Sequence, residues 1–83
     1  MVKAYVLVSA KPGTSEDIVR FLKEASAIKG VVAADSVFGR YDAIITLEVE
    51  DLKTLSQVLY KVIEKIPNVV RTETCLVMFS GNG

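Results

Sequence analysis

The sequence predicts an α+β domain whose elements follow the order β-α-β-β-α-β. Three observations carry this prediction: apolar runs of strand length, two segments with apolar residues at helical spacing, and turn signals between them. The chain of 83 residues is one domain long and divides into two similar β-α-β halves. Right-handed crossovers then place both helices on one face of a four-stranded antiparallel sheet, the ferredoxin-like arrangement.

The first half predicts a strand, a helix and a strand. Residues 3–9 form an apolar, β-branched run that stops at Lys11-Pro12-Gly13. Hydroxyl and acidic residues at positions 14–17 mark a helix start, and the pattern ends at Gly30. The apolar positions of this helix are Ile18, Phe21, Leu22, Ala25 and Ile28. Residues 31–38 form the second predicted strand.

The second half repeats the order. Residues 43–49 alternate apolar side chains and predict a third strand, and Asp51 caps a second helix. The buried stripe of that helix contains Leu52, Leu55, Leu59, Val62 and Ile66. Pro67-Asn68 ends the helix, and residues 69–79 form the last strand. We therefore expect one domain over residues 1–79 and a flexible tail over 80–83.

The sheet face away from the helices is expected to be apolar. Ala4, Val6 and Val8 are predicted to point one way, and Tyr5 and Leu7 the other. The last strand carries Val70, Leu76 and Met78 on one side and Val69, Cys75, Val77 and Phe79 on the other. Half of the residues are hydrophobic, which is much for so short a chain. We therefore predict a homodimer that packs this open face on a second copy.

Composition limits the partners and the location. Ten Lys and Arg balance ten Asp and Glu, so no basic field attracts a phosphate backbone, and we expect no direct nucleic acid binding. The single Cys75 has no partner for an internal disulfide, fits a reducing compartment and is expected to be a small buried hydrophobe. Neither a secretory leader nor an apolar run of membrane-spanning length occurs. We expect a cytoplasmic protein with no membrane partner.

The sequence lacks the residues that most catalytic sites and cofactor-binding sites require. Without histidine, imidazole base catalysis, His-ligated zinc and Ser-His-Asp chemistry are excluded. Neither a phosphate-binding loop, a dinucleotide fingerprint nor a Cys-x-x-Cys pair is present, so we expect no metal and no cofactor. Asp35 and Asp42 are seven positions apart, and nothing indicates that they converge as an acid/base pair. We predict that the chain is not an enzyme.

The segment Val37-Phe38-Gly39-Arg40-Tyr41-Asp42 is the strongest candidate site. It joins two apolar runs through one glycine, one base and one acid, a combination that suits a zwitterionic ligand. The alternative is a hairpin turn in which the glycine satisfies the turn and the aspartate bonds its own backbone. Thr72-Glu73-Thr74 is a second polar group within an apolar strand, and its threonines either pair within the sheet or line an interface cavity.

These residues resemble the RAM (regulation of amino acid metabolism) domain of the Lrp/AsnC transcription regulators. The most specific part is Phe38-Gly39-Arg40-Tyr41-Asp42 followed by an apolar strand. The second match is residues 67–74, Pro-Asn-Val-Val-Arg-Thr-Glu-Thr, where Asn68 stands in place of the family's usual glycine. Asparagine also tolerates the left-handed conformation, so the departure is mild. The resemblance covers nearly the whole chain.

The resemblance implies an amino acid effector and an oligomer. Dimers would form through the sheet faces and assemble into larger rings, an octamer or decamer, with the effector bound between dimers. Gly39 and Arg40 would present donors to the effector's α-carboxylate, Tyr41 would wall the site, and Asp42 would support the loop or accept from the ammonium group. Thr72 and Thr74 are weaker candidates for contacts from the last strand.

The chain begins at the first strand of the effector domain, whereas the Lrp/AsnC regulators carry a helix-turn-helix domain before it. The resemblance therefore implies a stand-alone RAM domain that senses an amino acid and modulates amino-acid-responsive transcription. It could act on full-length Lrp/AsnC relatives through mixed oligomers. The alternatives are a small dimeric ferredoxin-like enzyme and a purely structural assembly module.

Overall fold

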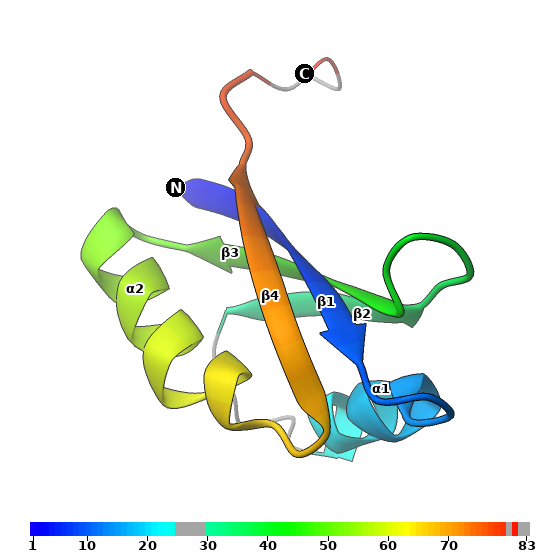
Figure 1. Ribbon diagram of the computed structural model, residues 1–83. Helices are drawn as coiled ribbons and strands as arrows, with labels where there is room; N and C mark the ends of the chain where they lie inside the picture. Colours follow the sequence, from blue (N-terminus) through cyan, green and yellow to red (C-terminus); the bar gives the residue numbers. More distant parts are fainter. Residues whose placement is uncertain (25–29, 80, 82–83) are drawn as a thin grey trace.

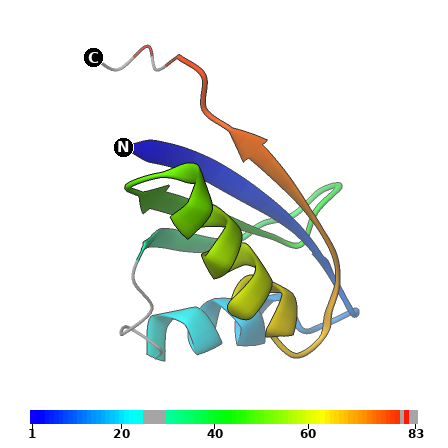
Figure 2. The same ribbon diagram turned by 90° about the vertical axis from the view of Figure 1, so that its left-hand side faces the viewer.

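The computed structural model describes residues 1–24, 30–79 and 81, and it confirms the predicted order of elements (Figure 1). The elements are β1 (Val2–Ala10), α1 (Ser15–Glu24), β2 (Val31–Ser36), β3 (Ala43–Val49), α2 (Leu52–Lys61), the 3₁₀ turn η1 (Ile63–Lys65) and β4 (Val69–Leu76). The strands form one antiparallel sheet in the order β2-β3-β1-β4. Both helices lie on the same side of that sheet, as the ferredoxin-like fold requires (Figure 2).

The hydrophobic core fills the space between the helices and one sheet face. Its members are Ala4, Val6, Val8, Ile18, Leu22, Ala43, Ile45, Leu47, Val49, Leu55, Ile63 and Ile66. The members from β1 and β3 occupy alternate positions, so the predicted alternation of these two strands is confirmed. Two residues of the predicted helical stripes, Phe21 and Leu52, are instead 43% and 60% exposed. Ala25, Ile28 and the rest of the predicted helix before Gly30 lie outside the described residues.

The end of α2 differs from the predicted single helix that runs to Pro67. The helix ends at Lys61 and tightens into η1, where the Ile66 N–H donates to the Ile63 carbonyl oxygen at 3.3 Å. Proline disfavours the helical conformation of the residue before it, and Ile66 is extended, with φ −67° and ψ 130°. Asn68 follows with φ 73°, which confirms that it takes the left-handed conformation.

Two strands are shorter than predicted. β2 stops at Ser36, because the chain then turns and the Val37 N–H donates to the Asp42 carbonyl oxygen at 3.0 Å. β4 stops at Leu76. The Val77 N–H still donates to the Lys3 carbonyl oxygen at 2.9 Å, but β1 begins only one residue earlier, so the chain beyond has no neighbouring strand. That segment extends past the sheet in Figure 1, and most of the predicted tail over 80–83 lies outside the described residues.

The open sheet face is less apolar than the sequence suggested. Paired residues in an antiparallel ladder share a face, so Tyr5 lies with Thr46 and Cys75, and Leu7 lies between Ile44 and Glu73. The large apolar side chains that β1 and β3 contribute to this face are therefore Tyr5, Leu7 and Ile44.

β4 contributes charged residues and an exposed Cys75 to the open face, instead of the expected buried cysteine. A register shift between Ser9 and Ala10 also pairs Val69 with Ala10 and packs it against the core, away from the face predicted for it. Within the described residues, no helix is long and apolar enough to cross a membrane.

Candidate functional site

The loop between β2 and β3, residues 37–42, is a projecting hairpin (Figure 1). Its base is closed by the bond from Val37 to Asp42, while Phe38, Gly39 and Arg40 are exposed. Gly39 has a φ of 149°, a backbone conformation that side chains other than glycine rarely adopt, and no atom lies near the position of an added Cβ. The glycine is therefore required by the turn itself and leaves the outer surface of the loop open to a ligand.

Asp42 fixes the hairpin to the central strand β1. The ladder between β1 and β3 ends at the pair Val8 and Ala43, so the next N–H group of β1 on that side, at Ala10, lies beyond the end of β3. The Asp42 Oδ2 atom accepts a hydrogen bond from the Ala10 N–H at 2.8 Å, and the Asp42 N–H donates to the Val8 carbonyl oxygen at 2.8 Å. The carboxylate thus supports the loop by taking the place of a missing strand residue.

Tyr41 fixes the hairpin to the edge strand β4. Its hydroxyl group donates a hydrogen bond to the Glu73 Oε2 atom at 2.9 Å, across 32 positions of sequence. This bond raises the pKa of Tyr41 above its ordinary value, and partial burial and the negative charge of Glu73 act in the same direction. The positive charges of Arg40 and Arg71 oppose the shift, which places both arginines in the electrostatic surroundings of the phenol.

The structure brings Gly39, Arg40, Tyr41 and Asp42 together but does not bring Thr72 and Thr74 to them. Thr72 pairs with Val8 and Thr74 with Val6, so both threonines share the face that the helices cover. Thr72 is half-buried there, and Thr74 is exposed. Arg71, Glu73 and Cys75 of β4 lie on the open face instead, and Glu73 is bonded to the hairpin through Tyr41.

Arg71 and Glu73 are therefore candidate site residues that the sequence analysis did not include. The strand pattern contained a usable signal, because Glu73 interrupts an apolar strand two positions after Arg71 and residues two apart share a face. The pattern did not say which face that was, because the face depends on the register in which β4 pairs with β1, which the sequence of one strand does not specify. Only the pairing of β4 with β1 in the structure shows that Arg71 and Glu73 lie on the open face.

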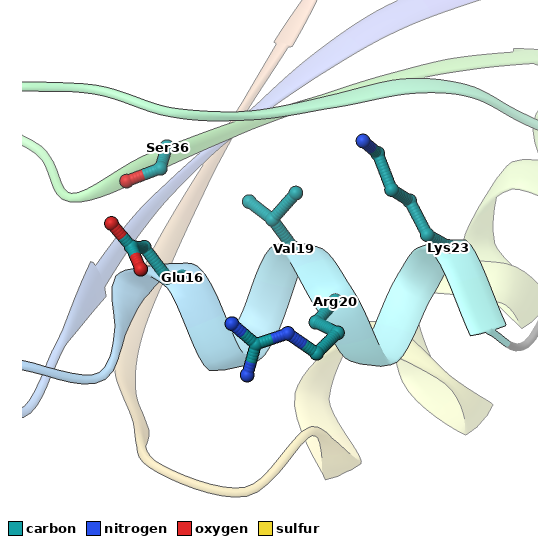
Figure 3. A pocket seen from close by; sticks show the side chains of 5 residues that line it. All are labelled: Glu16, Val19, Arg20, Lys23 and Ser36. Carbon is teal, nitrogen blue, oxygen red and sulfur yellow. The ribbon is translucent and has the colours of Figure 1, made fainter.

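A separate hollow of about 240 Å³ lies between α1 and the end of β2 (Figure 3). Its lining residues are Glu16, Val19, Arg20, Lys23 and Ser36. The Ser36 hydroxyl lies 3.0 Å from that of Ser15, and Arg20 is paired with Asp17 at 3.3 Å, so part of its polar lining is already satisfied. None of the predicted site residues lines it. The described part of the chain also shows no group of three or more side chains placed to hold a metal ion.

The fold and the braced hairpin define a small ferredoxin-like domain that presents a fixed loop beside an open sheet face. The family model of the Lrp/AsnC ligand binding domain matches residues 3–80. The chain belongs to this family, as its resemblance to the RAM domain predicted, and the family is one of regulators rather than enzymes. A comparison with curated proteins gives no significant match.

Solved structures show the same fold. A hypothetical protein from Pyrococcus horikoshii is 30% identical with a TM-score of 0.82, and the match covers 98% of this chain and 94% of that one. AsnC of Escherichia coli is 22% identical with a TM-score of 0.78, and the match covers 96% of this chain but 52% of AsnC.

A feast or famine regulatory protein from M. tuberculosis, solved with L-methionine, is 18% identical with a TM-score of 0.73. That match covers all of this chain and 54% of the regulator. This chain therefore spans about half the length of AsnC and of the M. tuberculosis regulator.

The hydrogen bond from Ala10 to Asp42 predicts that substitutions of Asp42 change the stability of the fold. The substitution Asp42→Ala leaves the Ala10 N–H without its charged acceptor and should lower the free energy of unfolding by about 1–3 kcal/mol, measured by urea denaturation. Asp42→Asn keeps an oxygen acceptor and should cost less. Asp35→Ala, at an exposed position on β2, is the control. Equal losses for Asp42→Ala and Asp35→Ala would contradict the bracing role of Asp42.

The bond from Tyr41 to Glu73 makes a pH prediction. Since Glu73 raises the pKa of Tyr41 above 10.0, the substitution Glu73→Gln should lower that pKa. NMR titration of labelled tyrosine measures the change. The bond stabilises the fold while Tyr41 is protonated, so in the wild type its contribution should be lost as the pH rises past the raised pKa. Glu64→Gln, on η1, serves as the control and should leave the pKa of Tyr41 unchanged.

Proposed function

We propose that this chain binds a free amino acid as an effector and thereby modulates amino-acid-responsive transcription. The observation that carries the proposal is the hairpin of residues 39–42, whose outer surface is exposed while its base is hydrogen-bonded to both β1 and β4. Membership of the Lrp/AsnC ligand-binding family supports it, as does the L-methionine complex of a structural relative. A loop held in one conformation before binding loses little entropy when a ligand arrives.

The proposed contacts are those that the family resemblance implies, and the exposed loop is open to a ligand that makes them. Gly39 and Arg40 present donors to the α-carboxylate, through backbone N–H groups and the guanidinium group, which suits bidentate binding of a carboxylate. Tyr41 forms one side of the binding site. Asp42 acts mainly as the brace, because one of its carboxylate oxygens already accepts from Ala10. Thr72 and Thr74 take no part in this proposal, since they lie on the other face of β4.

The assembled form is proposed to be a homodimer that packs the open faces together, with dimers joining into a larger ring. Tyr5, Leu7 and Ile44 form the apolar centre of that face in the structure. The hairpin stands at the margin of the face, where a neighbouring chain would convert an exposed loop into an enclosed site. A mixed assembly with full-length Lrp/AsnC relatives would carry the effector signal to DNA.

The binding proposal is tested by thermal melting with each of the twenty amino acids at millimolar concentration. A ligand present at 100 times its dissociation constant stabilises the folded state by about 2.7 kcal/mol, so one or a few amino acids should raise the melting temperature. The substitution Arg40→Ala should remove the rise, whereas Arg20→Ala, at an exposed arginine on α1, should keep it. No shift for any amino acid would favour a purely structural assembly module.

The dimer is tested by equilibrium sedimentation at micromolar concentration. The wild type should sediment as a dimer or larger, and Leu7→Glu should shift it to a monomer because a charge would be buried at the centre of the interface. Leu52→Glu, at an exposed position on α2, should leave the assembly intact. A monomeric wild type rules out the proposed interface.

A further inference from the structure

The charges around Tyr41 form a cluster that comes from two separate elements. Arg40 and Tyr41 belong to the hairpin, and Arg71 and Glu73 belong to β4. The bond between the Tyr41 hydroxyl and the Glu73 carboxylate joins the two elements at 2.9 Å. Arg71 stands two positions from Glu73, so both side chains leave the same face of the sheet roughly 6.6 Å apart along the strand. One small ligand can span that interval.

The cluster carries two positive charges and one negative charge. Within the described residues, neither Arg40 nor Arg71 takes part in an ion pair, while Arg20 is paired with Asp17. A neutral amino acid offers one carboxylate and one ammonium group, which match one arginine and Glu73 and leave the other arginine unmatched. An acidic side chain supplies a carboxylate for that second arginine, whereas a basic side chain adds repulsion.

We propose that the site selects an amino acid with an acidic side chain, with Arg40 binding the α-carboxylate, Glu73 accepting from the ammonium group and Arg71 binding the side-chain carboxylate. This inference rests on the proposed function, and it adds the class of effector to it. Tyr41 acts as a positioning residue, because its hydroxyl donates to one oxygen of Glu73 and holds that carboxylate toward the hairpin. The protein as a whole has no net charge, so the selection arises from this local cluster rather than from an overall field.

An acidic amino acid and its amide have nearly the same shape, so a difference in their affinities reports the effect of side-chain charge rather than of size. Isothermal titration calorimetry of the assembled wild-type protein with L-glutamate, L-glutamine, L-aspartate, L-asparagine and L-lysine should give at least tenfold tighter binding of each acid than of its amide. L-lysine should bind most weakly. The preference should decrease as the salt concentration rises, because it arises from the attraction between opposite charges, which dissolved ions weaken.

Two substitutions test which carboxylate of the ligand each arginine binds. Arg71→Gln should reduce the ratio of glutamate to glutamine affinity to about one, mainly because glutamate binding weakens. Arg40→Gln should weaken both ligands by a similar factor, because both carry the α-carboxylate. Arg20→Gln is the matched control on α1 and should change neither affinity. Circular dichroism of each variant confirms that the fold is retained.

The outcomes separate this inference from the proposed function. Equal or tighter binding of the amides, or a wild-type preference that persists in Arg71→Gln, overturns the acidic class and leaves effector binding in place. A failure of every amino acid to bind overturns both the class and the function. Preferential binding of the acids that disappears in Arg71→Gln supports the assignment of all three charged groups.

Discussion

The hydrogen bond from the Ala10 N–H to the Asp42 carboxylate is the contact on which the candidate site depends. It lies where β3 has ended and β1 continues, so it extends the sheet by one bond without extending the strand. A buried or half-buried N–H group that lost this acceptor would carry a penalty, which keeps the loop in one position. The Tyr41 hydroxyl adds a second attachment on β4. The exposed residues between these attachments are therefore presented from a fixed base.

The sheet divides the domain into a stabilising side and an interacting side. Every core residue from β1 and β3 points toward the helices, where burial of apolar surface supplies the stability of so short a chain. The opposite face combines a few apolar residues at its centre with charged residues on β4. This division lets the surface of the open face vary without disturbing the core.

The proposed position of the site links ligand binding to assembly. If an effector contacts the hairpin of one chain and a neighbouring chain at once, its binding energy favours the assembled form, and assembly raises the affinity for the effector by the same factor. No moving lid is needed for this coupling. The braced hairpin then acts as a rigid half of a shared site, and the response comes from the population of oligomers rather than from a change of fold.

The sequence by itself determined the order of the elements, the extent of β3, the capping of α2 by Asp51 and the position of the hairpin. These features depend on local chemistry: alternation, helical spacing, cap residues and a glycine at the turn. The resemblance had indicated that asparagine at position 68 tolerates the left-handed conformation of the family's usual glycine, and Asn68 adopts it, with φ 73°.

Only the tertiary structure decided which residues of β4 meet the hairpin and what Asp42 binds. The register of β4 against β1 decides which residues lie on each face, and it places Thr72 and Thr74 on the helix side and Arg71 and Glu73 on the open face. The partner of Asp42 lies on another strand, 32 positions away, and no local pattern specifies it. Register and long-range contacts arise from the packing of the whole sheet, which is why they became visible only in three dimensions.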